Sequence, residues 1–224
     1  AGSNVGSEYA ARQPSDGYTL FLGTVANAIN MTLYKNLGYD LLRDFMPISI
    51  ASTAPAVLVV HPSLPAKNIG ELIGLARTSK TPLTMASAGT GSSNHLVGEL
   101  FQMLTGVKFI HVPYRGTAPA GLAVISGEAD LQIDQVAPAL PNIVSGRLRA
   151  LATSGAKRWQ GMPDVPTLSE AGMAGFVYDP AWHAIFAPVA TPRAIVDRLN
   201  QEVLKALQVP SVRMRLEDMG GEAK

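Results

Sequence analysis

The sequence predicts an α/β protein with mostly parallel sheets, and two observations lead to this prediction. Apolar runs of strand length alternate with segments of helical periodicity along the whole chain. Hydrophobic residues make up 47% of the 224 residues, which allows a sizeable core in one large domain or two small ones. The chain shows neither an internal repeat nor a low-complexity segment.

Eight apolar runs have the length and the flanking turn residues that are typical of strands. The first follows the turn "PSDG", and the last precedes "VATPR". The runs expected to form strands are 17–23, 44–52, 56–62, 82–87, 108–114, 129–135, 148–154 and 182–188.

Capping signals mark the helices between these strands. Asn68 with Glu71, and Thr167 with Glu170, have the spacing of capping boxes. Thr191 is expected to cap a long final helix that has a proline at its first position. Further helices are expected over 26–36, from Ser92 or Ser93 to Gly106 and from Thr117 to 126, and a helix or turn is expected within 137–146.

Two proline clusters, "HPSLPAKN" and "FAPVATPR", mark places where the chain is expected to cross between two lobes. Lobe one would then comprise 1–59 and 183–224, and lobe two would comprise 60–182.

The composition excludes several function classes. Charged residues are 16% of the chain and the net charge is +1, so nothing indicates a nucleic-acid partner. The absence of cysteine excludes disulfides, thiolate catalysis and cysteine-bound metal. The four histidines lack metal-ligand spacing, so we expect no metal site. No apolar run approaches the roughly 20 residues that span a bilayer, and the chain shows no signal peptide.

The stretch "ASAGTGSSNHLVGELF" passes from a strand through a Gly/Ser loop into a helix. Gly89 and Gly91 allow backbone N–H groups to approach a ligand, and the helix start adds partial positive charge. The earliest acid in the helix is Glu99, so the positive end stays free for an outside anion. The P-loop lysine, the third glycine of the dinucleotide fingerprint and the nucleophile-elbow pattern are all missing. The residues alone leave an anion site and an ordinary serine cap equally open.

Other polar residues stand where strands end. His95 with Ser92 or Ser93 could form a serine–histidine pair, but no third member of a triad is evident, so a polar contact beside the loop is the favoured interpretation. Arg115 could pair with a carboxylate or lie in solvent. The remaining candidates are Asp134, Thr24 and Asn27, of which Asp134 could instead cap the next helix.

Eight motifs in this order resemble the Bug family, the periplasmic solute-binding proteins of tripartite tricarboxylate transporters. They cover nearly the whole chain: "PSDGYTLFLGT", "VLVVHPSLPAKNIGELI", "ASAGTGSSNHLVGELF", "HVPYRGTAPA", "ISGEADLQID", "GRLRALATSGAKR", "MPDVPTLSEAGMAGF" and "FAPVATPRAIVDRLNQEV".

The resemblance implies a fold of the periplasmic binding protein type, with two α/β lobes and a ligand cleft between them. It implies a periplasmic location, a small carboxylate as ligand, membrane permease subunits as partners, no cofactor and no reaction on the ligand. The ligand-binding residues that it implies are Thr24, Asn27, Ser87, Ala88, Gly89, Ser92, Ser93, His95, Arg115 and Asp134.

This chain departs from the family pattern at several places. It has Ile133 before Asp134 where the family usually shows Phe, and His183 after Trp182 where the family usually shows Tyr. Family members also begin with a strand, a ligand loop and a helix ahead of the segment that matches "AGSNVG", so we expect lobe one to lack its opening βα unit. Two alternatives to a solute-binding protein stay open: a serine-dependent hydrolase that uses Ser92 or Ser93 with His95, and a truncated, non-binding interaction module.

Overall fold

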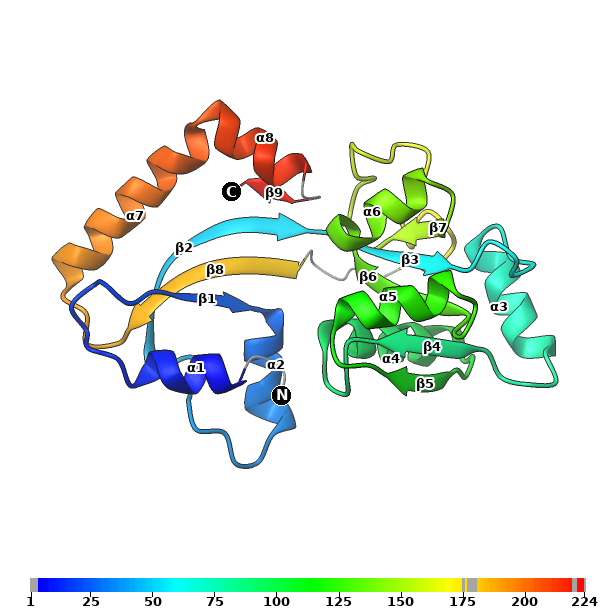
Figure 1. Cartoon of the computed structure of the whole chain (residues 1–224), viewed down its shortest axis with the longest axis horizontal. Coiled ribbons are helices and arrows are strands. Elements are labelled where there is room, and N and C mark those ends of the chain that lie inside the picture. Colours follow the sequence, from blue (N-terminus) through cyan, green and yellow to red (C-terminus); the bar gives the residue numbers. More distant parts are fainter. Residues whose placement is uncertain (1–3, 175, 177–180, 219–220, 224) are drawn as a thin grey trace. The chain divides into compact units, whose positions relative to one another are not determined.

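The computed structural model describes residues 4–174, 176, 181–218 and 221–223, and the chain divides into two compact units (Figure 1). Unit 1 comprises Ala1–Thr53 and Ala181–Lys224, and unit 2 comprises Ala54–Pro180. The boundaries therefore differ from those expected at 59/60 and 182/183. The strand that begins at Ala56 pairs within unit 2, and the strand that begins at Ala181 pairs within unit 1. Residues 177–180, just before the second boundary, lie outside the described part.

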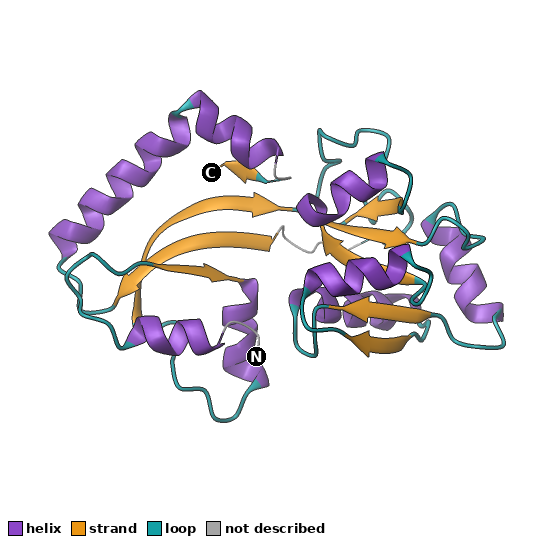
Figure 2. Ribbon diagram, viewed as in Figure 1, coloured by secondary structure: helices purple, strands orange, loops and turns teal. Residues whose placement is uncertain are grey.

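Unit 1 combines a sheet with helices from both of its chain segments (Figure 2). In the described residues the sheet has four strands in the order β1-β8-β2-β9, and β1 pairs antiparallel with β8. The strands are β1 (Phe21–Thr24), β2 (Phe45–Ala54), β8 (Ala181–Pro188) and β9 (Glu222–Ala223). The helices are α1 (Asn4–Ala11), α2 (Val25–Leu33), α7 (Arg193–Gln208) and α8 (Pro210–Asp218).

An aromatic cluster forms the core on one side of the unit 1 sheet. The rings of Phe21 and Phe45 stack with centroids 4.9 Å apart, and the ring of Phe186 lies 6.0 Å from Phe21. On the other side Val196 of α7 packs against Ile48 and Ala187. Because β1 pairs with β8, the two chain segments of unit 1 depend on each other for their core.

Unit 2 is a sheet covered by helices on both faces (Figure 2). Its strands are β3 (Ala56–Val60), β4 (Thr84–Ser87), β5 (Ile110–Pro113), β6 (Leu131–Gln135) and β7 (Arg149–Thr153). Its helices are α3 (Ile69–Thr78), α4 (Ser93–Thr105), α5 (Thr117–Ile125) and α6 (Val136–Val144).

The unit 2 sheet has the strand order β5-β4-β6-β3-β7 in the described residues. Strand β4 pairs parallel with β5 and β6, whereas β3 pairs antiparallel with β6 and β7. The α/β class is thus confirmed, and the expected parallel pairing holds for the β5-β4-β6 half of the sheet. All of β3 is buried because Val57 and Val59 face α5 and α6 while Leu58 and Val60 face α3 and α4.

The capping signals have mixed outcomes. Asn68 caps α3 by accepting the N–H of Glu71 at 2.9 Å, and Gly106 ends α4 in the left-handed region at φ 70°. The expectation for Thr191 is wrong by one residue, because Pro192 precedes the first helical residue of α7. The hydroxyl of Thr191 instead donates to the carbonyl oxygen of Pro188 at 2.7 Å. Among the described residues, no helix has the length and apolar character needed to cross a membrane.

Candidate carboxylate-binding site

Three strands of unit 2 end at one edge of its sheet. Because β4 is parallel to both β5 and β6, the carboxyl ends of all three strands meet there, and Ser87 lies opposite Pro113. Ligand-binding loops of open α/β sheets stand at such an edge. The predicted residues of unit 2 follow these strand ends: the loop from Ser87 into α4, Arg115 after β5, and Asp134 in β6.

The loop after β4 is held in one shape by two glycines and a serine cap. Gly89 has φ 126° and Gly91 has φ 77°, values in the region that favours glycine. The carbonyl oxygen of Gly89 accepts the N–H of Ser92 at 3.1 Å, and the Ser92 hydroxyl accepts the N–H of His95 at 3.3 Å. Ser92, rather than Ser93, is therefore the N-cap of α4.

The first turn of α4 has unused hydrogen-bond donors. Within the described part of the chain, the backbone N–H groups of Ser93 and Asn94 have no acceptor. This turn also contains no acidic residue. A helix N-terminus carries roughly half a positive charge, so these donors suit a carboxylate oxygen. Ala88, Ser92 and Ser93 are partly exposed, which leaves the loop accessible.

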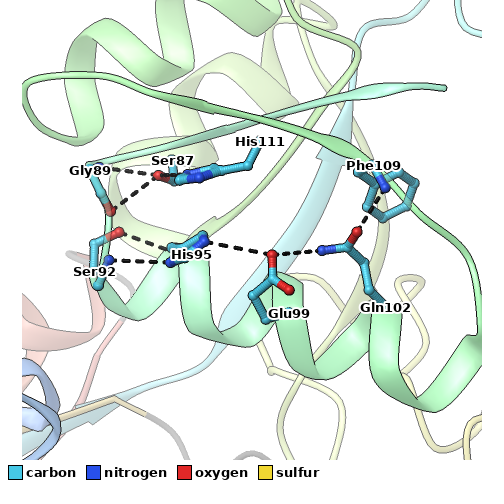
Figure 3. Close-up of polar contacts among 9 residues, drawn as sticks. Ser87, Gly89, Ser92, His95, Glu99, Gln102, Phe109 and His111 are labelled. Carbon is cyan, nitrogen blue, oxygen red and sulfur yellow. Dashed lines mark hydrogen bonds and ion pairs between the residues drawn. The ribbon is translucent and has the colours of Figure 1, made fainter. Parts of the chain in front are cut away.

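The ring of His95 is held by the loop and by its own helix (Figure 3). Its Nδ1 accepts the N–H of Gly91 at 3.2 Å, so in the neutral ring the proton lies on Nε2. Nε2 is directed at the carboxylate of Glu99, 3.6 Å away. The serine–histidine pairing considered for a hydrolase is therefore not formed, because the two ring nitrogens face Gly91 and Glu99 rather than the hydroxyl of Ser92.

A second imidazole, that of His111 in β5, lies against this loop (Figure 3). Its ring stacks on that of His95, with centroids 3.9 Å apart and planes inclined by 23°. Its Nε2 is 2.6 Å from the hydroxyl of Ser87. Ser87 is fully buried, so this hydroxyl has a role inside the protein rather than access to a substrate.

Asp134 joins β6 to the start of α4. Its Oδ1 accepts hydrogen bonds from the side-chain amide of Asn94 at 3.0 Å and from the N–H of Gln135 at 2.7 Å. The residue is 5% exposed, and burial raises the pKa of its carboxyl to about 7, although both hydrogen bonds act in the opposite direction. Near neutral pH it is therefore only partly charged, which limits its repulsion of an anion at α4.

Arg115 lies in the neighbouring loop with an exposed side chain. The two loops touch, because the N–H of Tyr114 donates to the carbonyl oxygen of Ser87 at 2.9 Å. A guanidinium on this loop suits a second carboxylate.

The two predicted residues of unit 1 are hydrogen-bonded to each other. The backbone N–H of Thr24 donates to Oδ1 of Asn27 at 2.8 Å. The amide nitrogen of Asn27 donates to the hydroxyls of Ser7 and Tyr39, at 2.8 and 3.4 Å. Asn27 is fully buried, and its amide is used within unit 1, whereas Thr24 is partly exposed.

Sequence reasoning missed Asn94, His111 and Gln102 as parts of this network. The amide of Gln102 donates to Glu99 at 2.8 Å and accepts the N–H of Phe109 at 2.7 Å (Figure 3). Asn94 stands two residues after the helix cap, and that position was the one available signal. No group of three described His, Asp or Glu side chains is placed to hold a metal ion.

Comparison with known proteins identifies the protein family of this chain. The sequence profile of the tripartite tricarboxylate transporter family receptor matches residues 1–224. The chain belongs to this receptor family. This match confirms the resemblance to the Bug family that the sequence motifs indicated.

The chain is similar to several known proteins. It is 38% identical over 221 residues to a protein from the tcbD–tcbE intergenic region of Pseudomonas sp. strain P51, with 98% of this chain and 66% of that protein aligned. It also resembles the structure of Rhodopseudomonas palustris MatC with bound malate, with 33% identity, a TM-score of 0.89, and 100% and 76% of the two chains covered. The structure of R. palustris Rpa4515 with adipate shares 36% identity at a TM-score of 0.92, over 98% and 74%.

The chain spans only part of the length of its curated relatives. It spans 66%, 63% and 65% of the length of three curated relatives, the third of which is BugT of Bordetella pertussis.

Proposed function

We propose that the receptor binds a small dicarboxylate in the periplasm and passes it, chemically unchanged, to the membrane permease of a tripartite tricarboxylate transporter. The observation that carries this proposal is the start of α4, where the N–H groups of Ser93 and Asn94 lack acceptors within the described residues and the first turn lacks an acid. Malate and adipate, the ligands named for two similar structures, are both dicarboxylates.

One ligand carboxylate would lie on the first turn of α4, with the hydroxyl of Ser93 as an added donor. The helix N-terminus contributes about 0.3–1 kcal/mol, and up to about 2 kcal/mol where it is partly buried. Each hydrogen bond to a charged group adds about 1.5–3 kcal/mol. Arg115, in the adjacent loop, is the proposed partner of the second carboxylate.

The test is calorimetric titration with adipate and malate of the wild type, Ser93→Asp and Ser93→Asn. An aspartate at the first helical position places a fixed negative charge beside the free N–H groups, so affinity should fall by at least about 100-fold. The fold should persist, because an acid is favourable in the first helical turn. Asparagine matches aspartate in size without its charge and should retain most of the affinity.

Three results would contradict the proposal. Equal affinity of the folded Ser93→Asp variant would place the carboxylate elsewhere. Wild-type protein that shows neither binding heat nor thermal stabilisation would favour a non-binding interaction module, since ligand at 100 times its Kd should stabilise by about 2.7 kcal/mol. Turnover of a chromogenic ester that is lost in Ser93→Ala would favour the hydrolase.

A further inference from the structure

The hydroxyl of Ser87 stands at the centre of three contacts (Figure 3). It is 2.6 Å from Nε2 of His111, it accepts the N–H of Gly89 at 3.1 Å, and it is 3.2 Å from the carbonyl oxygen of Gly89. A serine hydroxyl has a single proton to donate. When Nε2 of His111 is unprotonated, Ser87 donates to the ring. When Nε2 carries a proton, the ring donates, and the serine proton turns to the Gly89 carbonyl.

Gly89 connects the Ser87 hydroxyl to the start of α4. Its carbonyl oxygen also accepts the N–H of Ser92, the residue that caps the helix. Its backbone, at φ 126°, lies where L side chains rarely fit. Three hydrogen bonds, His111–Ser87, Ser87–Gly89 and Gly89–Ser92, therefore connect the His111 ring to the cap of the proposed carboxylate site.

The charges that act on His111 come from α4. His95 stacks on its ring, and Glu99 lies beyond His95, whereas strand β4 (Thr84–Ser87) has no ionisable side chain. Partial burial, and then the neighbouring His95, lower the pKa of the His111 imidazole, while Glu99 raises it. The ring thus gains its proton at a pH below the ordinary histidine value of about 6.5.

We propose that His111 is a positioning residue of the carboxylate loop, which sets the direction of the Ser87 hydroxyl and links ligand affinity to a proton. This inference rests on the proposed function. A cation behind the loop favours a bound anion, and the bound anion in turn favours the cation. Because the pKa of His111 is lowered, affinity should therefore rise as the pH falls below the ordinary histidine value of about 6.5.

The first experiment needs no ligand. Nuclear magnetic resonance would follow the ring protons of His111 and the amide of Gly89 between pH 5 and 8. The Gly89 amide should shift with the same midpoint as His111 in the wild type, and this shared transition should vanish in Ser87→Ala. Two results would overturn the positioning role. The Gly89 amide could show no transition at the His111 midpoint in the wild type, or it could show the same transition in Ser87→Ala.

The second experiment measures adipate affinity at pH 8.0, 6.5 and 5.5 in the wild type, His111→Gln and His61→Gln. Glutamine can still bond Ser87 but does not titrate. A ligand-induced pKa rise of one unit corresponds to a tenfold change in affinity, so the wild type should gain up to about tenfold between pH 8.0 and 5.5 relative to His111→Gln. Adipate's own protonation is common to all three proteins and cancels. His61→Gln, the same exchange at a histidine bonded to Ser63, should behave as the wild type.

Equal pH profiles for the wild type and His111→Gln would overturn the proton linkage. Absence of adipate binding at every pH would instead count against the proposed function, and the ligand-free titration would still decide whether His111 positions the loop.

Discussion

Asn94 in the first turn of α4 and Asp134 near the end of β6 are joined by a 3.0 Å hydrogen bond, so a helix start and a strand end share one buried carboxyl. The same amide nitrogen of Asn94 also donates to the carbonyl oxygen of Ile133 at 2.9 Å. Asn94 thereby fixes α4 on the sheet, while its own backbone N–H belongs to the proposed carboxylate site.

Replacing Asp134 with asparagine should stabilise the protein above neutral pH. The native pKa, about 7, lies above the unfolded value, so the native state holds more protons between about pH 4 and 7 and its stability falls as the pH rises through this range. At about 1.4 kcal/mol per pKa unit, the cost above pH 7 reaches at most about 4 kcal/mol. Asp134→Asn should therefore gain more in urea denaturation at pH 8 than at pH 5. Asp164→Asn, the same exchange at an exposed position, is the control, and an equal gain at both pH values for Asp134→Asn would refute this account.

Replacing Gly89 with alanine should both destabilise unit 2 and weaken carboxylate binding. The backbone at φ 126° is strained for any L side chain, and a Cβ would lie 3.4 Å from the carbonyl oxygen of Tyr114. We expect a loss of about 1–3 kcal/mol in urea denaturation. Gly74→Ala provides the contrast, since its Cβ would meet nothing within 4 Å in α3 and the exchange should stabilise by about 0.5–1 kcal/mol. A Gly89→Ala variant with unchanged stability and unchanged carboxylate affinity would show that the loop shape is not required.

Replacing Asn27 with alanine should destabilise unit 1. The change leaves the N–H of Thr24 without its acceptor and removes the amide that bonds Ser7 and Tyr39. A loss of about 1–3 kcal/mol is expected for a buried polar group left unsatisfied. The fluorescence of Trp182, measured in a Trp159→Phe background, would report unfolding of unit 1. Asn36→Ala, at an exposed site, should change stability by less than about 0.5 kcal/mol, and a similarly small effect at Asn27 would contradict the structural role.

Sequence patterns predicted the parts of the fold that depend on neighbours in the chain. Every expected apolar run overlaps an observed strand, and Ser92 caps α4 as one of the two candidates. The start of the site was visible because its glycines, its serines and its lack of an early acid stand within one short stretch.

Contacts between distant residues could not be predicted in this way. The pairing of Ser87 with His111 requires β4 and β5 to lie in parallel register, and the bond from Asn94 to Asp134 requires β6 on the other side of β4. The antiparallel pairing of β3 with β6 and β7 was not predicted. A strand that is buried on both faces shows the same apolar run whichever way it runs in the sheet. Asn27 has a suitable polar side chain beside a helix start, yet its amide serves the interior of unit 1.

The division of the chain into two units also means that unit 2 is completed before unit 1 during synthesis. Unit 2 is one continuous stretch, so all strands of its sheet have been made before β8 emerges from the ribosome. Strand β1 is made early but pairs with β8, which follows the whole of unit 2 in the sequence. Pairing of strands so far apart in sequence is slow, and an early strand without its partner is exposed to aggregation. A chaperone that holds the newly made chain would therefore be needed most by the segment around β1.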